Sequence, residues 1–423
     1  MNNIKKMHSE FTDFYVFNTE KFNTILLFFT LELPLSKFSE EDIPYVHLLP
    51  YILKKKLYDS KNLTKCSYVR DIVVNTEKKG ENFFIYFEIE VPSEKLISQQ
   101  NILKGGIDLL FNLIFQPIFE NNKIQEVEIE YSKIELKKQI DIYSSDAFIS
   151  SNIRILEEMY PNDLYIKSIY KYKNLLTENI CIAHINKIYE YIISISEKNL
   201  YLIGSIDTKQ IDIAIDENKN YKIYANNHLN KPIEKINNLN NRKTKHVLEE
   251  DEINQGKLLV GIKTLTRNDY KSLVTLKLAN GILGKFPTSL LFSALREREH
   301  LCYFVNSQIN FDKNHIIITV STNYSNYVDL LNKIENEITK LKSQGISDKL
   351  FNQTKLQFIN LYKEGLDNPK GILNKVIDYK NFKLESLEEE MEIINSITID
   401  DIIENTTTWS IDTIYQLNNG GHI

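Results

Sequence analysis

The sequence predicts an α+β protein of two similar half-domains, each an antiparallel sheet covered by helices, and three observations lead to this prediction. The chain has 423 residues, which is more than one ordinary hydrophobic core holds. The predicted elements occur twice in the same order: a strand, a helix, a pair of strands and several helices. Residues 215–250 are rich in Asn and Lys and lack hydrophobic periodicity. We therefore expect a first domain at residues 1–218, a linker at 219–250 and a second domain at 251–423.

The first half is predicted to begin with strands at residues 14–17 and 24–31. A helix at 40–57 follows, with Ser39 as a cap and Pro50 as an interruption. A pair of strands comes next, joined through a turn at Lys79-Gly80. The two strands of this pair are expected at residues 71–76 and 82–91. Helices are expected at residues 102–119, 127–142, 146–159 and 177–193, and a buried strand at 199–206.

The second half repeats this order. A strand at residues 257–263 is followed by a helix at 269–282, and strands at 301–309 and 315–320 are predicted to pair across a short turn. Helices are expected at residues 328–341, 347–364, 386–396 and 399–405, and a strand at 410–417.

Composition narrows the class of protein. Charged residues make up 26% of the chain and apolar residues 42%, and the net charge is −6 with both signs interspersed, which argues against nucleic acid as a partner. Cys66, Cys181 and Cys302 lie far apart, so neither disulfides nor a cysteine zinc site is indicated. The N-terminus lacks the apolar region of a signal peptide, and the longest apolar run, 25–29, cannot span a bilayer. We expect a cytoplasmic protein without a membrane span.

The stretch from Gly284 to Asn306 places two residues of chemical interest seven positions apart. Arg296 lies at the charged end of a predicted helix, which should start near Pro287 and Thr288, and Tyr303 enters the next strand. A guanidinium and a phenol that converge on a substrate carbonyl could stabilise a tetrahedral oxyanion. Alternatively, Arg296 pairs with one of the neighbouring carboxylates, Glu297 or Glu299, and Tyr303 only packs in its strand.

This stretch reads Gly-x-x-x-x-Ser-x-Leu-Phe-x-x-Leu-Arg-Glu, followed by Leu-x-Tyr-x-Val, and it resembles the second half of the pitrilysin/insulysin-type zinc metallopeptidases. The resemblance covers essentially the whole chain. It implies two half-domains that close like a clamshell, and it implies that Arg296 and Tyr303 bind substrate. The residue before the Tyr is small in that family and is Cys302 here, which is a mild departure.

The same family carries a zinc motif, His-x-x-Glu-His, on the first long helix of its catalytic half. The matching stretch here is His47-Leu-Leu-Pro50-Tyr51, so Pro50 replaces the general base and Tyr51 replaces the second ligand. Glu128 and Glu130 lie near the position of the third ligand. Because a zinc site needs three or four ligands, we interpret His47 as a packed helix residue and both glutamates as solvated surface. No metal or other cofactor is expected in this chain.

The resemblance therefore implies the non-zinc subunit of a heterodimeric zinc metallopeptidase, inactive alone, which supplies Arg296 and Tyr303 to a zinc-bearing homologous partner. Its substrate would be a peptide bound along an edge strand, and the task would be maturation of a bacteriocin-like peptide or general peptide turnover. The alternative is a catalytically inert structural or chaperone-like peptide-binding subunit. An independent hydrolase has little support, because Gly-x-Ser-x-Gly is absent and the closest Cys–His pair is Cys302 and His300.

Overall fold

A computed structural model describes residues 4–9, 12–59, 68–69, 72–96, 101–115, 124–163, 180–217, 243–323, 327–343 and 345–419. The chain forms two compact units. Unit 1 comprises Met1–Asp141, Ser168–Glu234 and Glu364–Glu385, and unit 2 comprises Ile142–Lys167, Lys235–Lys363 and Ser386–Ile423. Each unit therefore contains a short segment that lies, in sequence, within the other unit's part of the chain.

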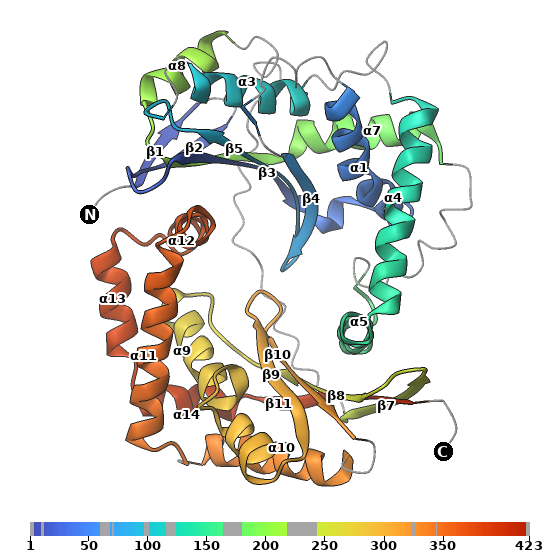
Figure 1. The fold of residues 1–423 in the computed structure, drawn as a ribbon, viewed down its shortest axis with the longest axis vertical. Helices are drawn as coiled ribbons and strands as arrows, with labels where there is room; N and C mark the ends of the chain where they lie inside the picture. The colour runs from blue at the N-terminus through green and yellow to red at the C-terminus, as the bar shows by residue number, and fades with distance from the viewer. Residues whose placement is uncertain are drawn as a thin grey trace. The chain divides into compact units, whose positions relative to one another are not determined.

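The sheet of unit 1 has six strands in the order β1-β2-β6-β3-β5-β4 (Figure 1). The strands are β1 (Ile4–His8), β2 (Asp13–Asn18), β3 (Thr24–Pro34), β4 (Ile72–Lys79), β5 (Asn82–Pro92) and β6 (Glu197–Gly204). In β5 every second side chain, from Phe83 to Val91, is buried, which is the alternation expected of a sheet with one apolar face.

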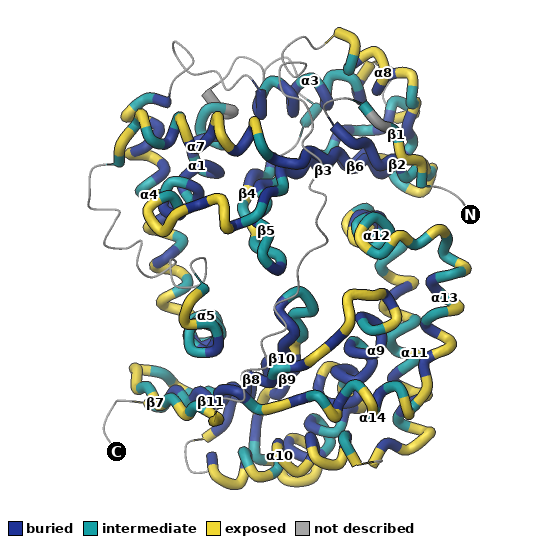
Figure 2. The backbone as a smooth tube through the Cα atoms, turned by 180° about the vertical axis from the view of Figure 1, so that it is seen from behind, coloured by how far each residue is buried: buried dark blue, intermediate teal, exposed yellow. Residues whose placement is uncertain are grey.

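Helices cover this apolar face of unit 1. They are α1 (Ile43–Asp59), α3 (Ile102–Phe115), α4 (Glu126–Ser145), α7 (Ile182–Ile195) and α8 (Thr208–Glu217), of which α1, α3 and α7 contact the strands. Phe29 of β3 meets Phe111 and Phe115 of α3 edge to face, with ring centroids 6.2 and 6.1 Å apart. The strands are predominantly buried where these helices lie (Figure 2).

The opposite face of the same sheet carries α12 (Pro369–Phe382), a helix from the C-terminal part of the chain (Figure 1). Asn368 caps it by accepting a hydrogen bond from the backbone N–H of Gly371 at 2.7 Å, and Pro369 occupies the first turn. Its buried side chains pack against four buried residues of the sheet. The seven residues of this cluster are Tyr15, Leu26, Tyr201, Ile203, Ile372, Leu373 and Val376.

Unit 2 has a five-stranded sheet in the order β7-β11-β8-β10-β9. The strands are β7 (Lys245–Asp251), β8 (Gly256–Lys263), β9 (Cys302–Asn310), β10 (His315–Thr322) and β11 (Ser410–Asn419). The helices that follow its strands are α9 (Tyr270–Asn280), α10 (Tyr327–Lys342), α11 (Asp348–Gly365), α13 (Leu387–Ser396) and α14 (Ile399–Thr407). Among these, α9 packs on β9 and is itself contacted by α13 and α14.

On the other face of this sheet lies α5 (Ala147–Met159), which comes from the N-terminal part of the chain (Figure 1). Ile155 and Met159 pack against Leu259, Ile317, Tyr415 and Leu417. The helix approaches the sheet so closely that a Cβ atom added to Gly261 of β8 would overlap the sulfur of Met159. The glycine thus leaves room for the Met159 side chain, which a larger residue at this position would displace.

The predicted fold class is confirmed, because the chain is α+β with two sheets covered by helices. The sheets are not purely antiparallel, however: β2 and β6 pair in parallel, as do β7 and β11. The prediction also omitted β1, α8, β7 and α12. Most of the expected linker lies outside the described residues, but its last residues form β7, because the parallel partner β11 completes their hydrogen bonding.

Candidate functional site

The segment that carries Arg296 and Tyr303 lies entirely in unit 2. After α9 the chain forms two π-helical turns, η4 (Gly281–Lys285) and η5 (Phe292–Arg298). Asn280 donates from Nδ2 to the carbonyl oxygen of Ser307 on β9 at 3.1 Å. A Cβ atom on Gly284 would approach the hydroxyl of Ser307 to 2.8 Å, so this glycine permits η4 to lie against β9.

The helix before Arg296 starts slightly later than expected. Helical residues begin at Leu290, and Ser289 accepts from the backbone N–H of Ser293 at 3.0 Å through its carbonyl oxygen. Its hydroxyl accepts from the N–H of Phe292 at 3.4 Å. The hydroxyl of Thr288, near which the helix was expected to start and which could have capped it, instead donates to Oε1 of Gln357 at 3.1 Å. Ser289 thus takes the capping role that the sequence suggested for its neighbour.

A tight reversal joins the end of this helix to β9. His300 has a φ of 51°, a left-handed conformation that commonly ends helices. The N–H of Leu301 then donates to the carbonyl oxygen of Leu295 at 2.8 Å, and the hydroxyl of Thr322 donates to the carbonyl oxygen of Leu301 at 2.5 Å. These bonds tie the residue next to Arg296 to the start of the strand that holds Tyr303.

Tyr303 occupies a β-bulge. On β10, Ser321 is opposite Phe304 and Thr322 is opposite Cys302, which leaves Tyr303 as the extra residue of β9. The bulge interrupts the alternation of the strand, so that Tyr303 and Phe304 are both exposed, at 62% and 39%, between two buried neighbours. Bulges commonly re-aim a side chain in this way, and here the bulge directs the phenol away from the core of unit 2.

Arg296 is exposed, and its guanidinium carbon lies 5.1 Å from the ring centroid of Phe292, one turn earlier. In the part of the chain that the structure describes, no ion pair involves Arg296. Glu299, one of the two carboxylates considered as its partner, pairs with Lys333 at 2.8 Å instead. The guanidinium is therefore accessible to a ligand from solvent.

The neighbouring thiol has the wrong properties for a nucleophile. Burial raises the pKa of Cys302 to about 11, and the positive charge of Arg296 offsets only part of this shift. The thiol is consequently protonated at neutral pH, whereas a nucleophilic cysteine acts as its thiolate. This argues against an independent cysteine hydrolase.

The degenerate zinc motif lies on α1 of unit 1. His47 is half-buried, and burial lowers its pKa to about 4, so that the imidazole is neutral at pH 7. Pro50 is buried within the helix, and Tyr51 is half-buried on the next turn. Proline offers no side-chain base, and the packed positions of these residues agree with the interpretation of His47 as a helix packing residue.

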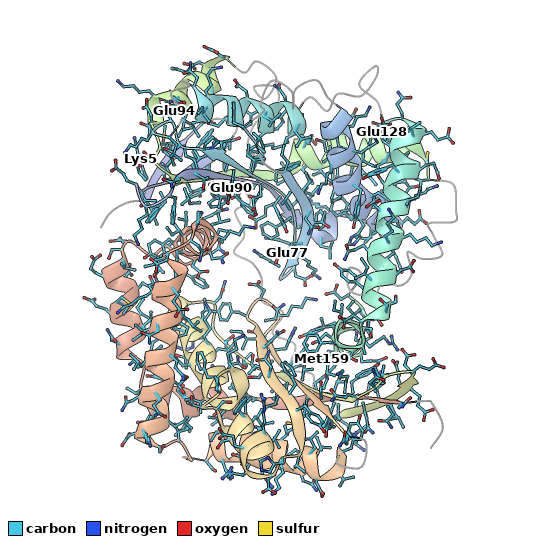
Figure 3. The ribbon with its side chains drawn as sticks, viewed as in Figure 1. Lys5, Glu77, Glu90, Glu94, Glu128 and Met159 are labelled. Carbon is cyan, nitrogen blue, oxygen red and sulfur yellow. The ribbon has the colours of Figure 1, made fainter. Side chains whose placement is uncertain are left out.

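Glu128 of α4, labelled in Figure 3, differs from its expected exposed position. It is 7% exposed, and its Oε1 lies 2.6 Å from the ammonium nitrogen of Lys56 on α1. Its Oε2 accepts from the N–H of Gln125 at 2.8 Å. The prediction was wrong because it ignored the counter-charge that α1 supplies. Glu130, in contrast, is exposed and pairs with Lys133 at 2.8 Å, as a surface residue would.

These residues do not fit a zinc ion. Among the described residues, no group of three His, Cys, Asp or Glu side chains is placed to hold a metal. Glu128, one of the two glutamates near the expected position of the third ligand, is already paired with the ammonium group of Lys56. The geometry of these residues therefore supports no zinc-dependent catalytic step on this chain.

A charged cluster that the sequence did not reveal lies in unit 1. Lys380 of α12 has its ammonium nitrogen 2.7 Å from Oε1 of Glu197 and 3.6 Å from Oε2 of Glu32, two residues on neighbouring strands. Glu32 stands in a strand that is mostly apolar, whereas Glu197 opens β6 and is followed there by Lys198 and Asn199. The Asn368-Pro369 pair at the start of α12 was the available signal for the helix that supplies the lysine.

Comparison with known proteins agrees with this geometry. Residues 189–358 match the family model described as "Peptidase M16 inactive domain". A Bacillus subtilis protein named "Probable inactive metalloprotease YmfF" is 27% identical to this chain, in an alignment that covers 99% of this chain and 98% of the B. subtilis protein. The chain is therefore similar to proteins of the M16 peptidase family. The resemblance inferred from the sequence is thereby confirmed at the level of the family, and the roles of Arg296 and Tyr303 stay predictions.

Two further proteins are similar to this chain. The B. subtilis protein AlbE, named for biosynthesis of the antilisterial bacteriocin subtilosin, is 20% identical over 92% of this chain and 95% of its own length. The solved structure of a conserved protein from Enterococcus faecalis V583 aligns with 100% of this chain and 100% of its own, with 19% sequence identity and a TM-score of 0.83. The latter similarity establishes the fold alone. In the described residues, no helix is long and apolar enough to cross a membrane.

Proposed function

We propose that this chain is the non-zinc subunit of a heterodimeric zinc metallopeptidase, and that it contributes Arg296 and Tyr303 to peptide cleavage at the zinc site of a homologous partner. The observation that carries the proposal is the bulge at Tyr303, because it exposes a phenol at the start of the strand that follows Arg296, whose guanidinium is exposed as well. The same chain lacks the residues for zinc, so the two halves of the machinery would be divided between two chains.

The chemistry assigned to this chain is positioning and charge stabilisation. The Tyr303 hydroxyl would donate a hydrogen bond to the oxyanion that forms when the scissile carbonyl is attacked. The Arg296 guanidinium would hold a nearby backbone carbonyl of the peptide with two of its N–H groups. The partner's zinc would supply the activated water and polarise the scissile carbonyl.

An extended peptide is the proposed substrate. β9 is the last strand of its sheet, so its outer edge pairs with no other described strand and can accept a peptide by main-chain hydrogen bonding. The similarity to AlbE supports maturation of a small peptide such as a bacteriocin as the task, with general peptide turnover as the other possibility. We propose that this takes place in the cytoplasm.

A second candidate is a catalytically inert peptide-binding subunit with a structural or chaperone-like role. The names of the matching family model and of YmfF, both of which contain the word inactive, favour it. It predicts the same edge strand for peptide binding, but assigns no rate effect to Tyr303. The two candidates therefore differ in a measurable quantity.

The test is co-expression with a homologue from the same genome that contains His-x-x-Glu-His, followed by peptide cleavage assays on the purified complex. Tyr303→Phe should lower kcat by about 10²–10³-fold, because one oxyanion donor is lost while the ring is kept. Arg296→Ala should weaken peptide binding as well as turnover. Glu297→Gln is the matched control, since this exposed carboxylate directly follows Arg296 and should be silent.

Two results would contradict the proposal. If Tyr303→Phe and Arg296→Ala complexes cleave peptide at the parental rate, the pair is structural and the inert subunit is the better description. A 1:1 complex with such a homologue should bury about 1,600 Å² or more, as stable interfaces do. If the chain forms no such complex with any of these homologues, it does not act as the subunit of a heterodimer.

A further inference from the structure

A cavity of about 510 Å³ lies in unit 1, on the sheet face that α12 covers, and it is separate from the segment that carries Arg296 and Tyr303. This volume is in the usual range for small-molecule sites, about 300–1,000 Å³. The cavity is bounded by β1, β2 and β6 on one side and by the last turn of α12 and the residues after it on the other. Its lining residues are Ile4, Lys6, Asp13, Tyr15, Glu197, Val376, Tyr379, Lys380, Lys383, Leu384 and Glu385.

The inner part of this cavity is rich in carboxylates. The side chains of Asp13 and Glu197 are only 3% and 11% exposed, and Glu32 lies behind them, within 3.6 Å of Lys380. Lys380 is the cation among them and is shared between two of the carboxylates. Burial raises the pKa of Glu32, and the positive charge of Lys380 offsets part of this shift.

The outer part of the cavity carries lysines instead. Lys6 pairs with Asp13 at 3.2 Å, but its side chain is 41% exposed. Lys383 ends α12 in a left-handed conformation, with a φ of 56°, and is exposed beside the equally exposed Glu385. The mouth of the cavity therefore holds more ammonium groups than carboxylates, Lys6 and Lys383 against Glu385, whereas the inner part holds more carboxylates than ammonium groups.

An aromatic wall connects the two regions. The ring of Tyr15 has the ammonium nitrogens of Lys6 and Lys380 at 5.3 and 5.9 Å from its centroid, and it stacks on Tyr201 at 5.1 Å. This ring offers contact area to a ligand that enters the cavity, beside the two ammonium groups that already lie over it. Apolar contact area is available from Ile4, Val376 and Leu384.

We propose that this cavity binds a small zwitterion, such as a free apolar amino acid or a short peptide with both ends unblocked. Its ammonium group would lie inside, near Asp13, Glu197 and the ring of Tyr15. Its carboxylate would lie at the mouth, near Lys6 and Lys383. A ligand with only negative charge would meet the inner carboxylates, and one with only positive charge would meet the outer lysines, so a ligand with both charges fits the order of groups best.

The experiment is isothermal titration calorimetry on the purified full chain, without a partner subunit, so its result is independent of the proposed peptidase role. The probes are L-leucine, its N-acetylated form and its C-terminal amide. L-leucine should give a saturable heat of binding. Each blocked form should bind at least about tenfold more weakly than L-leucine, because a charge-assisted hydrogen bond is lost at one end.

Lys383→Ala is the test variant, since this exposed residue supports neither the helix packing nor the sheet, and it should weaken L-leucine binding about tenfold. Lys209→Ala, which removes an exposed lysine of α8 in the same unit, is the matched control and should bind like the parent. Equal binding of L-leucine and its blocked forms overturns the proposal. So does an equal effect of the two lysine variants, or the absence of any binding heat at millimolar L-leucine.

Discussion

The two units hold a helix from the opposite part of the chain in different ways. In unit 1, Lys380 of α12 inserts a buried ammonium between two carboxylates of the sheet, Glu197 and Glu32. In unit 2, the residue after α5, Tyr160, places its hydroxyl 2.8 Å from Nδ1 of the buried His315. Both docked helices also bury apolar side chains. In unit 1 the docked helix itself supplies the ammonium, whereas in unit 2 the residues after α5 supply the Tyr160–His315 contact and a buried ion pair between Asp163 and Lys313, whose side chains are each 6% exposed.

The ion pairs that α5 itself makes in unit 2 lie farther out. Arg154 of α5 bonds to Glu249 of β7 through Nε at 3.0 Å, and its side chain is 35% exposed. Lys245 at the start of β7 pairs with Glu158, also near the surface. Exposed pairs are worth little, whereas removing one member of a buried cluster leaves uncompensated charge. Hence the two docked helices, α12 and α5, should respond differently to the removal of their own charges and similarly to the loss of apolar packing.

The largest effect is expected for Lys380→Met. This change leaves Glu32 and Glu197 buried without their ammonium partner, and should reduce the stability of unit 1 by about 3–5 kcal/mol. Hydrogen exchange measured peptide by peptide would report it, because β3 and β6 should lose protection while β8 and β10 keep theirs. The triple variant Lys380→Met, Glu32→Gln, Glu197→Gln should regain protection. Unchanged exchange in β3 and β6 of the single variant would show that the cluster does not hold unit 1 together.

Apolar truncation should affect the two units alike. Ile372 of α12 and Ile155 of α5 are 1% and 0% exposed, and each change to Ala should cost about 2–5 kcal/mol in its own unit through the cavity left behind. Exchange should rise in the strands under α12 for one variant and under α5 for the other. Val328→Ala, at a residue 74% exposed, is the silent control. A change that spreads equally over both units would mean that they unfold as one.

Acid should weaken unit 2 through His315. Burial, together with the charges of Lys313 and Lys263, lowers the pKa of this histidine to about 3. Below its unfolded pKa of about 6.5, the unfolded chain binds a proton that the folded unit does not, so stability falls as the pH decreases. The loss between pH 7 and pH 5 should be about 2 kcal/mol. His315→Asn should flatten this slope in exchange experiments on β10, and a variant with the parental slope would rule out this origin.

The smallest effect is expected for Arg154→Gln. Its pairs with Glu249 and Glu157 are partly solvated, so their loss should change the stability of unit 2 by less than about 1 kcal/mol. Raising the salt concentration should shrink the difference further. Thermal unfolding of the parent and variant at low and high salt would check it. A loss as large as that of Lys380→Met would show that both units depend on ion clusters to the same degree.

Much of the fold follows from local patterns. The alternation in β5 and the capped helices, such as α9 with Asp269 accepting from the N–H of Ser272 at 2.7 Å, are visible in the sequence because neighbouring residues suffice to form them. The helix α12 was missed, although Asn368 and Pro369 mark its start. Its polar composition hides the narrow apolar stripe of Ile372, Leu373 and Val376.

The candidate site was predictable in part. The sequence placed Arg296 at a helix end and Tyr303 at a strand start, but the bulge that exposes the phenol depends on how β9 pairs with β10. The counter-charge of Glu128 comes from Lys56, about seventy residues earlier in the chain, so its burial could not be inferred from the charged helix around it. Side-chain exposure at such positions depends on partners that are distant in sequence.

By itself the sequence determined the α+β class, the repeated order of elements and the loss of the zinc motif, because periodicity, capping and residue identity are local properties. Only the tertiary structure decided which unit each helix joins, where Lys380 finds its two carboxylates, and that Tyr303 leaves the alternation of its strand. These features arise from contacts between segments far apart in the chain, whose pairing is selected by the free energy of burial in the folded protein rather than by local preference.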